Sequence, residues 1–211
     1  MKDFKESNIN LQKATIATFH IMATETQALG KRAMQPGMPF FVDKIGDVKL
    51  SKLIMDMLMS AAELVTPTFI CNQVIKYAAT AKAPNTIKES CNFITQLIVE
   101  FGPSIPLKET IDLAKVAAAH ATPAVRQAAM KLFKEMYKHA GDALRSFMTD
   151  IKDSTLKMID AELKQVTKYN KGEHQPTREL RGAAAAAVKP SKGGGGGGGG
   201  GAVDLMDSLP R

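Results

Sequence analysis

Basic side chains recur at one position in successive segments of the chain, and this is the chemistry of a surface that binds anions. Lys49, Lys88 and Arg126 each follow directly after an apolar residue, at a spacing of 38 or 39 residues, and Asn10 holds the same position in the first segment. Lys52 stands three residues after Lys49. Such a row would complement an acidic partner. Ordinary solvated charge is the competing interpretation, because Lys and Arg are usually exposed.

Residues that most often carry catalysis or hold metals are scattered along the sequence. The four histidines, at 20, 120, 139 and 174, form no HExxH pair, and Cys71 and Cys91 form no CxxC pair. The glycine run from 193 to 201 lacks the strand and helix that a phosphate-binding loop needs. We therefore expect no catalytic residues, no cofactor and no metal, and a protein that is not an enzyme.

The elements that position the basic residues repeat with the same spacing. Apolar residues begin each segment at Ile9, Val48, Ile87 and Val125, and others follow seven residues later. Seven residues are two turns of a helix, so each segment presents one apolar stripe to its neighbours. A unit of about 40 residues with two helices is typical of HEAT solenoids. Stacked units align their loops along one edge, where we expect the functional residues.

The helices can be placed from the apolar pattern and from proline. We expect Ser7 or Asn8 to cap the first helix, and we expect the prolines at 36 and 39 to leave regular helix only in the second half of 30–47. No alternating strand pattern is present, so the sequence predicts an all-α fold. The other predicted helices are 8–27, 48–65, one opened by Pro67, 84–101, one opened by Pro106, 122–139 with a continuation from Gly141 to Met148, and 152–169.

Composition and charge limit the remaining possibilities. The chain has 211 residues, 45% of them apolar, and a formal net charge of +7. No apolar run approaches the roughly 18 residues of a membrane span, and the N-terminus lacks the apolar stretch of a signal peptide, so we expect a soluble chain with reduced core thiols. The positive charge indicates an anionic partner without identifying it.

The composition changes after Tyr169. From 168 to 192 there are six basic and two acidic residues, and the glycine run follows. We expect two units: a folded domain at 1–169, and a disordered, basic, Gly-rich tail at 170–211 that leads toward a further domain. A flexible basic arm suits loose contact with a polyanion. A linker that is basic only for solubility is the alternative.

Three strings of this sequence resemble a known family. They are FVDKIGDVKLS at 41–51, ATPAVRQAAMKLF at 121–133 and LKMIDAELKQ at 156–165. They are similar to the TOG domains of the ch-TOG and Minispindles family of microtubule polymerases, and most similar to the third-type domain from the middle of the array. The resemblance covers roughly residues 3–167. KIGDVK and TPAVR are its specific motifs, and the C-terminal VDLMDSLPR is similar to the segment that leads into the next TOG domain.

The resemblance implies a flat paddle of HEAT repeats that binds αβ-tubulin through the loops along one edge. Arg126 matches the PAVR-like loop of the family and is expected to be exposed there. The tubulin-binding residues implied by the match and by the register are Phe4, Lys5, Asn8, Asp47, Lys49, Lys52, Asn85, Lys88, Thr122 and Arg126. The expected role is promotion of microtubule growth and spindle organisation in the cytoplasm, on the microtubule cytoskeleton and at spindle poles or centrosomes. Adaptor proteins of the spindle pole or kinetochore are further expected partners.

One departure from the family concerns an aromatic anchor. TOG domains that bind tubulin strongly place a Trp in the first loop, whereas this chain contains no Trp. Either Phe4 stands at that position or a first repeat precedes Met1, and the sequence leaves both possibilities open. Loss of a large anchor from an interface centre costs about 2 kcal/mol or more, so the resemblance predicts weak tubulin affinity for the isolated domain.

Two other binding functions compete with this interpretation. A generic HEAT scaffold or adaptor would bind a protein partner on its helical faces rather than at the loops. Nucleic-acid binding through the tail would require aromatic residues among the basic ones for base stacking, and only Tyr169 is available there. We therefore expect neither nucleic acid nor a membrane as a partner.

Overall fold

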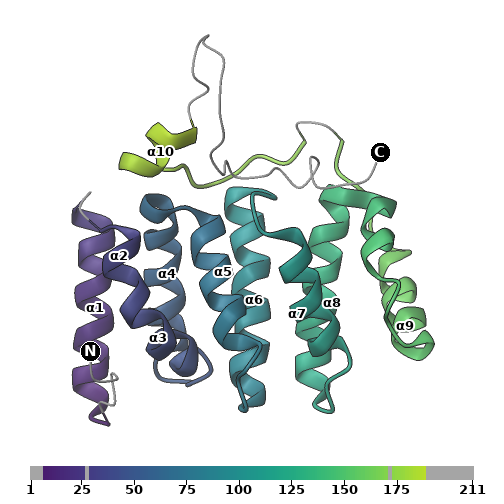
Figure 1. Ribbon diagram of the computed structural model, residues 1–211, viewed down its shortest axis with the longest axis horizontal. Helices are drawn as coiled ribbons and strands as arrows, with labels where there is room; N and C mark the ends of the chain where they lie inside the picture. Colours follow the sequence, from purple (N-terminus) through teal and green to yellow (C-terminus); the bar gives the residue numbers. More distant parts are fainter. Residues whose placement is uncertain (1–6, 27–28, 171–172, 189–211) are drawn as a thin grey trace.

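The computed structural model describes residues 7–26, 29–170 and 173–188, and its regular elements in these ranges are all helices (Figure 1). The prediction of an all-α chain is therefore confirmed. In chain order the elements are α1 (Ile9–Glu25), α2 (Lys31–Met34), the 3₁₀ helix η1 (Gln35–Gly37), α3 (Met38–Lys44), α4 (Ser51–Val65), α5 (Pro67–Ala78), α6 (Pro84–Phe101), α7 (Leu107–Ala118), α8 (Pro123–Ala140), the 3₁₀ helix η2 (Gly141–Phe147), α9 (Asp153–Leu163) and α10 (Gly182–Val188).

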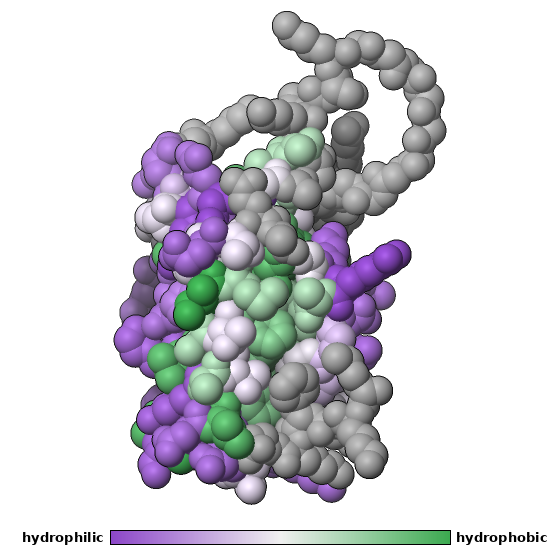
Figure 2. Space-filling model, turned by 90° about the vertical axis from the view of Figure 1, so that its left-hand side faces the viewer, coloured by the Kyte–Doolittle hydropathy of each residue, from purple (hydrophilic) through white to green (hydrophobic). Residues whose placement is uncertain are grey.

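The helices stack side by side into a flat solenoid, as the repeat predicted: the stack is broad in Figure 1 and narrower when seen from its end in Figure 2. Helices α1, α4, α6 and α8 run in one direction, and α3, α5 and α7 run back between them. Helix α1 packs on α4, α6 packs on α8, and α5 contacts α3, α4, α6 and α7. Helix α9 packs against α8 at the far end. This arrangement places the loops of successive repeats at the same edge of the molecule.

Proline and short caps set the helix starts. Pro67, Pro84 and Pro123 open α5, α6 and α8 at the first helical position, where a missing N–H removes no hydrogen bond. The predicted cap of the first helix is Asn8, whose side chain accepts a hydrogen bond from the Asn10 amide at 2.9 Å. The short η1 at Pro36 separates α2 from α3. Regular helix in the second half of this segment was predicted and is present, but the short α2 in the first half was not predicted.

The apolar register holds for the later repeats and fails at one position. Ile94 and Leu132 are fully buried, and Val125 is buried as well. Val48, however, is 90% exposed, and Leu50 occupies the core in its place. The cause is local: the Asp47 carboxylate accepts a hydrogen bond from the Lys49 amide at 2.7 Å, and the Asp47 carbonyl accepts from Leu50 and Ser51. This turn delays the start of α4 to Ser51.

The predicted last helix also ends early. Helix α9 stops at Leu163 rather than near 169. The β-branched Val166 and Thr167 follow, and such residues favour helix less than unbranched ones do. The chain then turns so that the Tyr169 amide donates a hydrogen bond to the Lys138 carbonyl at 2.7 Å. It leaves the stack at the edge where α8 ends.

The prediction of a disordered tail from residue 170 is wrong for residues 173–188. Residues 173–181, called the strap below, run across the helix ends, and α10 follows them against α4 (Figure 1). Thr177 and Arg178 donate backbone hydrogen bonds to the Glu100 carbonyl at 3.0 Å. Ion pairs and main-chain hydrogen bonds hold this segment, and apolar contacts at Leu180 and the buried Ala184 add to them. The glycine run and the C-terminal VDLMDSLPR lie outside the described residues. That the tail connects to a further domain therefore stays a prediction.

Helices long and apolar enough to span a bilayer are absent from the described ranges.

Candidate functional site

The loops that the sequence singled out lie along one edge of the stack, at the lower side of Figure 1. This loop edge consists of the start of α1 at residues 7–8, the α3–α4 loop at 45–50, the α5–α6 loop at 79–83, the α7–α8 loop at 119–122, and the first turns of the helices that follow. The expected alignment of loops is therefore present.

A backbone contact fixes two of these loops against each other. A Cβ atom added to Gly46 would stand 2.7 Å from the Thr86 amide nitrogen and 2.8 Å from the Asn85 carbonyl carbon. The Thr86 hydroxyl also donates a hydrogen bond to the Asp43 carbonyl at 3.3 Å. Only glycine permits so close an approach. The α3–α4 loop and the start of α6 therefore form one continuous surface.

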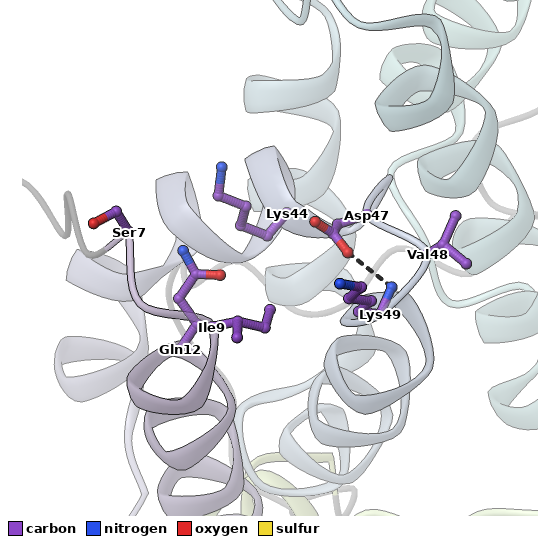
Figure 3. A pocket seen from close by; sticks show the side chains of 7 residues that line it. All are labelled: Ser7, Ile9, Gln12, Lys44, Asp47, Val48 and Lys49. Carbon is purple, nitrogen blue, oxygen red and sulfur yellow. Dashed lines mark hydrogen bonds between the residues drawn. The ribbon is translucent and has the colours of Figure 1, made fainter.

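An open hollow of about 660 Å³ lies where α1 begins (Figure 3). Figure 3 shows Ser7 and Gln12 on one side of it, and Asp47 and Lys49 on the other. The dashed line marks the hydrogen bond from the Lys49 amide to the Asp47 carboxylate, which holds the loop in shape. Ile9, Lys44 and Val48 complete the lining. The hollow at the loop edge is therefore lined by both polar and apolar side chains.

A second hollow, of about 430 Å³, lies between α4 and α6. Val48 lines it as well, so this exposed apolar side chain stands between the two hollows. The exposure of Val48 was not predicted, because the apolar register assigned this residue to the core. The Gly-Asp pair before it, a usual turn signal, could have placed it in the loop. The other residues around the hollow are Gly46, Ser51, Lys52, Met55, Asp56, Asn85, Lys88, Glu89 and Gln96.

The positive charge of the loop edge is uneven. The Lys52 ammonium group pairs with Asp56 at 2.9 Å, and Lys88 pairs with Glu89 at 2.8 Å. These carboxylates cancel part of the local field. The Lys49 ammonium group is exposed and makes no ion pair with another described residue. Lys82, in the α5–α6 loop, is exposed too and was absent from the predicted set.

Arg126 differs from its predicted exposure, because it is half-buried. Its Nη1 donates hydrogen bonds to the carbonyl of His120 at 2.9 Å and to that of Ala121 at 2.6 Å. These carbonyls lie just after α7, so the guanidinium group ties the end of α7 to the start of α8. The Thr122 amide donates to His120 Nδ1 at 3.0 Å in the same loop. Arg126 therefore shapes the loop as well as adding charge to it.

The remaining predicted residues are distributed along the same edge. Asn8 and Asn85 are exposed, whereas Asp47 and Thr122 are half-buried and use backbone or side-chain groups to shape their loops. Phe4 and Lys5 lie outside the described residues. Lys49, Lys52, Asn85 and Lys88 share the surface on both sides of the Gly46 contact, and Arg126 lies one repeat further along the edge.

The helix starts at the loop edge lack acidic residues. No Asp or Glu stands in the first turn of α1, α4, α6 or α8. Acidic residues normally stabilise a helix N-terminus by about 0.3–1 kcal/mol. The side chain of Asn8 caps α1 and the Asp47 carboxylate precedes α4, whereas α6 and α8 have no side-chain cap, so their partial positive charge is left without a side-chain acceptor. The ends of α3, α5 and α7 at the same edge offset part of this charge.

The His139, Tyr169 and His174 rings lie together at the end of α8, with centroids 4.7–5.5 Å apart, but they do not form a metal site. No cluster of three His, Cys, Asp or Glu side chains in the described part of the chain could hold a metal ion. Burial raises the pKa of both the Cys71 and Cys91 thiols to about 12. A thiol becomes a nucleophile only as the thiolate. These cysteines therefore act as small apolar core residues.

The sequence is similar to a known protein family and to its curated members. Residues 4–163 match the family model for the XMAP215/Dis1/CLASP TOG domain. The rice Protein MOR1 is 26% identical over 182 residues, which are 85% of this chain and 9% of that protein. The chain thus spans only a small part of that relative.

Two solved structures show the same fold. One is the TOG3 domain of Drosophila melanogaster Mini spindles, with a TM-score of 0.73 and 22% identity over 83% of this chain and 76% of that one. The other concerns tubulin recruitment and assembly by microtubule polymerases with TOG domain arrays, with a TM-score of 0.69 and 17% identity over 82% of this chain and 38% of that one. With most of its folded residues matched by the family model, the chain belongs to the XMAP215/Dis1/CLASP TOG domain family.

Proposed function

We propose that this chain is a tubulin-binding module of a microtubule polymerase and that it binds αβ-tubulin through the loop edge. The observation that carries the proposal is the alignment of loops on one edge, where an exposed Val48 stands beside Lys49, Lys52 and Lys88. Support comes from membership of the TOG family and from the structural likeness to a TOG array that recruits tubulin.

Each part of the edge has a distinct role in this proposal. Lys49 supplies exposed positive charge and steers an acidic surface into place, because charge complementarity raises association rates more than affinity. Val48 supplies an apolar contact at the centre, where burial contributes about 25 cal/mol per Å². Arg126 keeps the α7–α8 loop in its binding shape.

The cellular setting follows from the same proposal. The chain acts as a binding module without catalysis, on cytoplasmic microtubules and at spindle poles or centrosomes, and spindle or kinetochore adaptors are additional partners. A position as the third domain of an array is supported by the likeness to Mini spindles TOG3. Growth promotion is then a property of the array, to which this module contributes one tubulin contact. Neither nucleic acid nor a membrane is a partner in this proposal.

Co-migration with unpolymerised tubulin in size-exclusion chromatography tests the proposal. The variant Lys49→Glu/Lys52→Glu reverses two charges at the loop edge, and Lys157→Glu/Lys164→Glu makes the same change in net charge at the exposed surface of α9. We expect the first variant to lose co-migration and the second to retain it, because like charges at an interface cost several kcal/mol. Equal binding by both variants would place the contact elsewhere, and an unmodified chain that binds no tubulin even in an equilibrium titration suited to a weak complex would reject the function.

A further inference from the structure

The edge opposite the loop edge carries a second organised contact. Helices α1, α4, α6 and α8 end there, and Tyr169 and the strap lie across their ends (Figure 1). Carbonyl groups at all four ends accept hydrogen bonds from these residues. The pairs are Tyr169 N to Lys138 O at 2.7 Å, His174 Nε2 to Val99 O at 2.9 Å, Thr177 N and Arg178 N to Glu100 O at 3.0 Å, Arg181 N to Glu63 O at 2.7 Å, and Arg181 Nη2 to Ala23 O at 2.7 Å.

Two carboxylates add charge to these helix ends. Glu63 and Glu100 lie in the last turns of α4 and α6, and their side chains are only 14% and 17% exposed. Acidic residues are unfavourable at a helix C-terminus, which already carries partial negative charge. Two poorly solvated carboxylates in this position require cationic partners, because leaving such a charge unpaired is costly.

Arginine side chains of the strap meet that requirement. The Arg178 guanidinium group bridges both carboxylates, with Nη1 at 2.6 Å from Glu63 Oε1 and Nε bonded to Glu100. Arg181 Nε lies 2.5 Å from Glu63 Oε2. Burial alone would lower the pKa of Arg178, but the hydrogen bonds to Glu100 and Glu63 outweigh it and raise that pKa. The rigid fork of arginine suits such multiple contacts better than lysine does.

The strap is bound in the manner of an extended peptide rather than as part of the repeat core. Its backbone donates to helix carbonyls at 177, 178 and 181, and its two arginines, three residues apart, both contact the Glu63 carboxylate. An open hollow of about 710 Å³ is lined by these groups together with Glu179 and Leu180. Main-chain hydrogen bonds give such a site affinity, and the side-chain contacts give it specificity.

We propose that the ends of α1, α4 and α6 form a peptide-binding site for an extended Arg-x-x-Arg segment, and that residues 177–181 occupy it in cis. The site lies on the edge away from the loops and does not depend on tubulin binding. Tethering gives the strap a high effective concentration, so it excludes the same motif from other chains. When the strap is displaced, the site becomes available to an Arg-x-x-Arg peptide in trans.

Hydrogen exchange in the full chain tests occupation in cis. We expect the amides of Thr177, Arg178 and Arg181 to exchange at least about tenfold more slowly than in a free peptide of residues 173–188. The variant Arg178→Glu/Arg181→Glu should lose this protection, and adding Glu63→Arg/Glu100→Arg should restore it. Lys157→Glu/Lys164→Glu is the control for net charge and should exchange like the unmodified chain. Unprotected amides in the unmodified chain would overturn the proposal.

A labelled synthetic peptide of residues 175–185 tests the site in trans. We expect saturable binding to Arg178→Glu/Arg181→Glu, measured by fluorescence anisotropy and weakened by salt, and at least about tenfold weaker binding to the unmodified chain. A peptide with both arginines replaced by glutamate should not bind. If the doubly substituted chain proves unfolded by circular dichroism, Arg178→Gln alone replaces it. Equal binding of both peptides, or none by a folded, strap-released variant, would overturn the proposal.

Discussion

Gly46 and Thr86 meet backbone to backbone, 40 residues apart, so that a side chain on Gly46 would stand 2.7 Å from the Thr86 amide nitrogen. This contact joins the α3–α4 loop to the start of α6. It fixes Lys49 and Lys88 relative to each other more firmly than helix packing alone could.

Gly46→Ala should therefore be destabilising. The added methyl group meets rigid backbone, so we expect a loss of about 1–3 kcal/mol in the free energy of unfolding, measured by denaturant titration. Gly30→Ala is the matched control, because nothing lies within 4 Å of a Cβ atom there, and it should change stability by less than about 0.5 kcal/mol. Similar losses for both variants would contradict the close contact.

Arg126→Ala should affect stability as well as binding. It removes the two hydrogen bonds to the His120 and Ala121 carbonyls, and we expect a loss of about 1–2 kcal/mol because the guanidinium group is only half-buried. Lys49→Ala removes an exposed side chain and should leave the unfolding midpoint unchanged while weakening tubulin binding. If Arg126→Ala unfolds at the same denaturant concentration as the unmodified chain, Arg126 does not stabilise the α7–α8 loop.

Val48→Asp should weaken tubulin binding without lowering the stability of the domain. The side chain is 90% exposed, so we expect the thermal midpoint to stay within about 2 °C of that of the unmodified chain. Tubulin co-migration should weaken, because an acidic group replaces an apolar contact facing an acidic partner. Leu50→Asp is the contrasting control and should unfold the domain, since Leu50 is fully buried. A large loss of stability in Val48→Asp would indicate that this side chain is buried in the core.

Glu135 should give the fold a measurable acid sensitivity. Burial alone would raise the pKa of Glu135, but the nearby His139 imidazole, 3.8 Å away, and a hydrogen bond from the Lys138 ammonium group at 2.8 Å outweigh it and hold that pKa below its ordinary value of 4.5. A carboxylate with a lowered folded-state pKa adds stability above about pH 4.5 and loses it as the pH falls through the folded value. Unfolding curves at successive pH values should show this loss, and Glu135→Gln should flatten it. An equally steep acid loss in the variant would exclude Glu135 as a cause.

Local signals in the sequence predicted the solenoid well. Prolines at the first helical position marked the starts of α5, α6 and α8, and the seven-residue spacing placed Ile94 and Leu132 in the core. These features depend on residues close together in the chain. The row of loops followed from them, because stacked repeats align their ends.

Two features escaped prediction for different physical reasons. The register placed Val48 in the core because a periodic pattern does not show that an aspartate turn delays the helix by several residues. The strap was missed because its order comes from contacts between residues far apart, such as Arg178 with Glu63 at a separation of 115 residues. Composition reports how much apolar surface a segment can bury, and it gives no account of ion pairs formed with distant helix ends.

The path of the strap also changes how the molecule should unfold. In an open stack each repeat touches only its neighbours, so the ends can fray independently and the transition broadens. Here Arg181 contacts the carbonyls of Ala23 and Thr24 at the end of the first helix, 158 and 157 residues away. The strap thereby links the first helix to helices near the other end of the stack. Unfolding at one end would remove strap contacts that also stabilise the other end. The domain should melt as one cooperative unit whose two ends report the same transition.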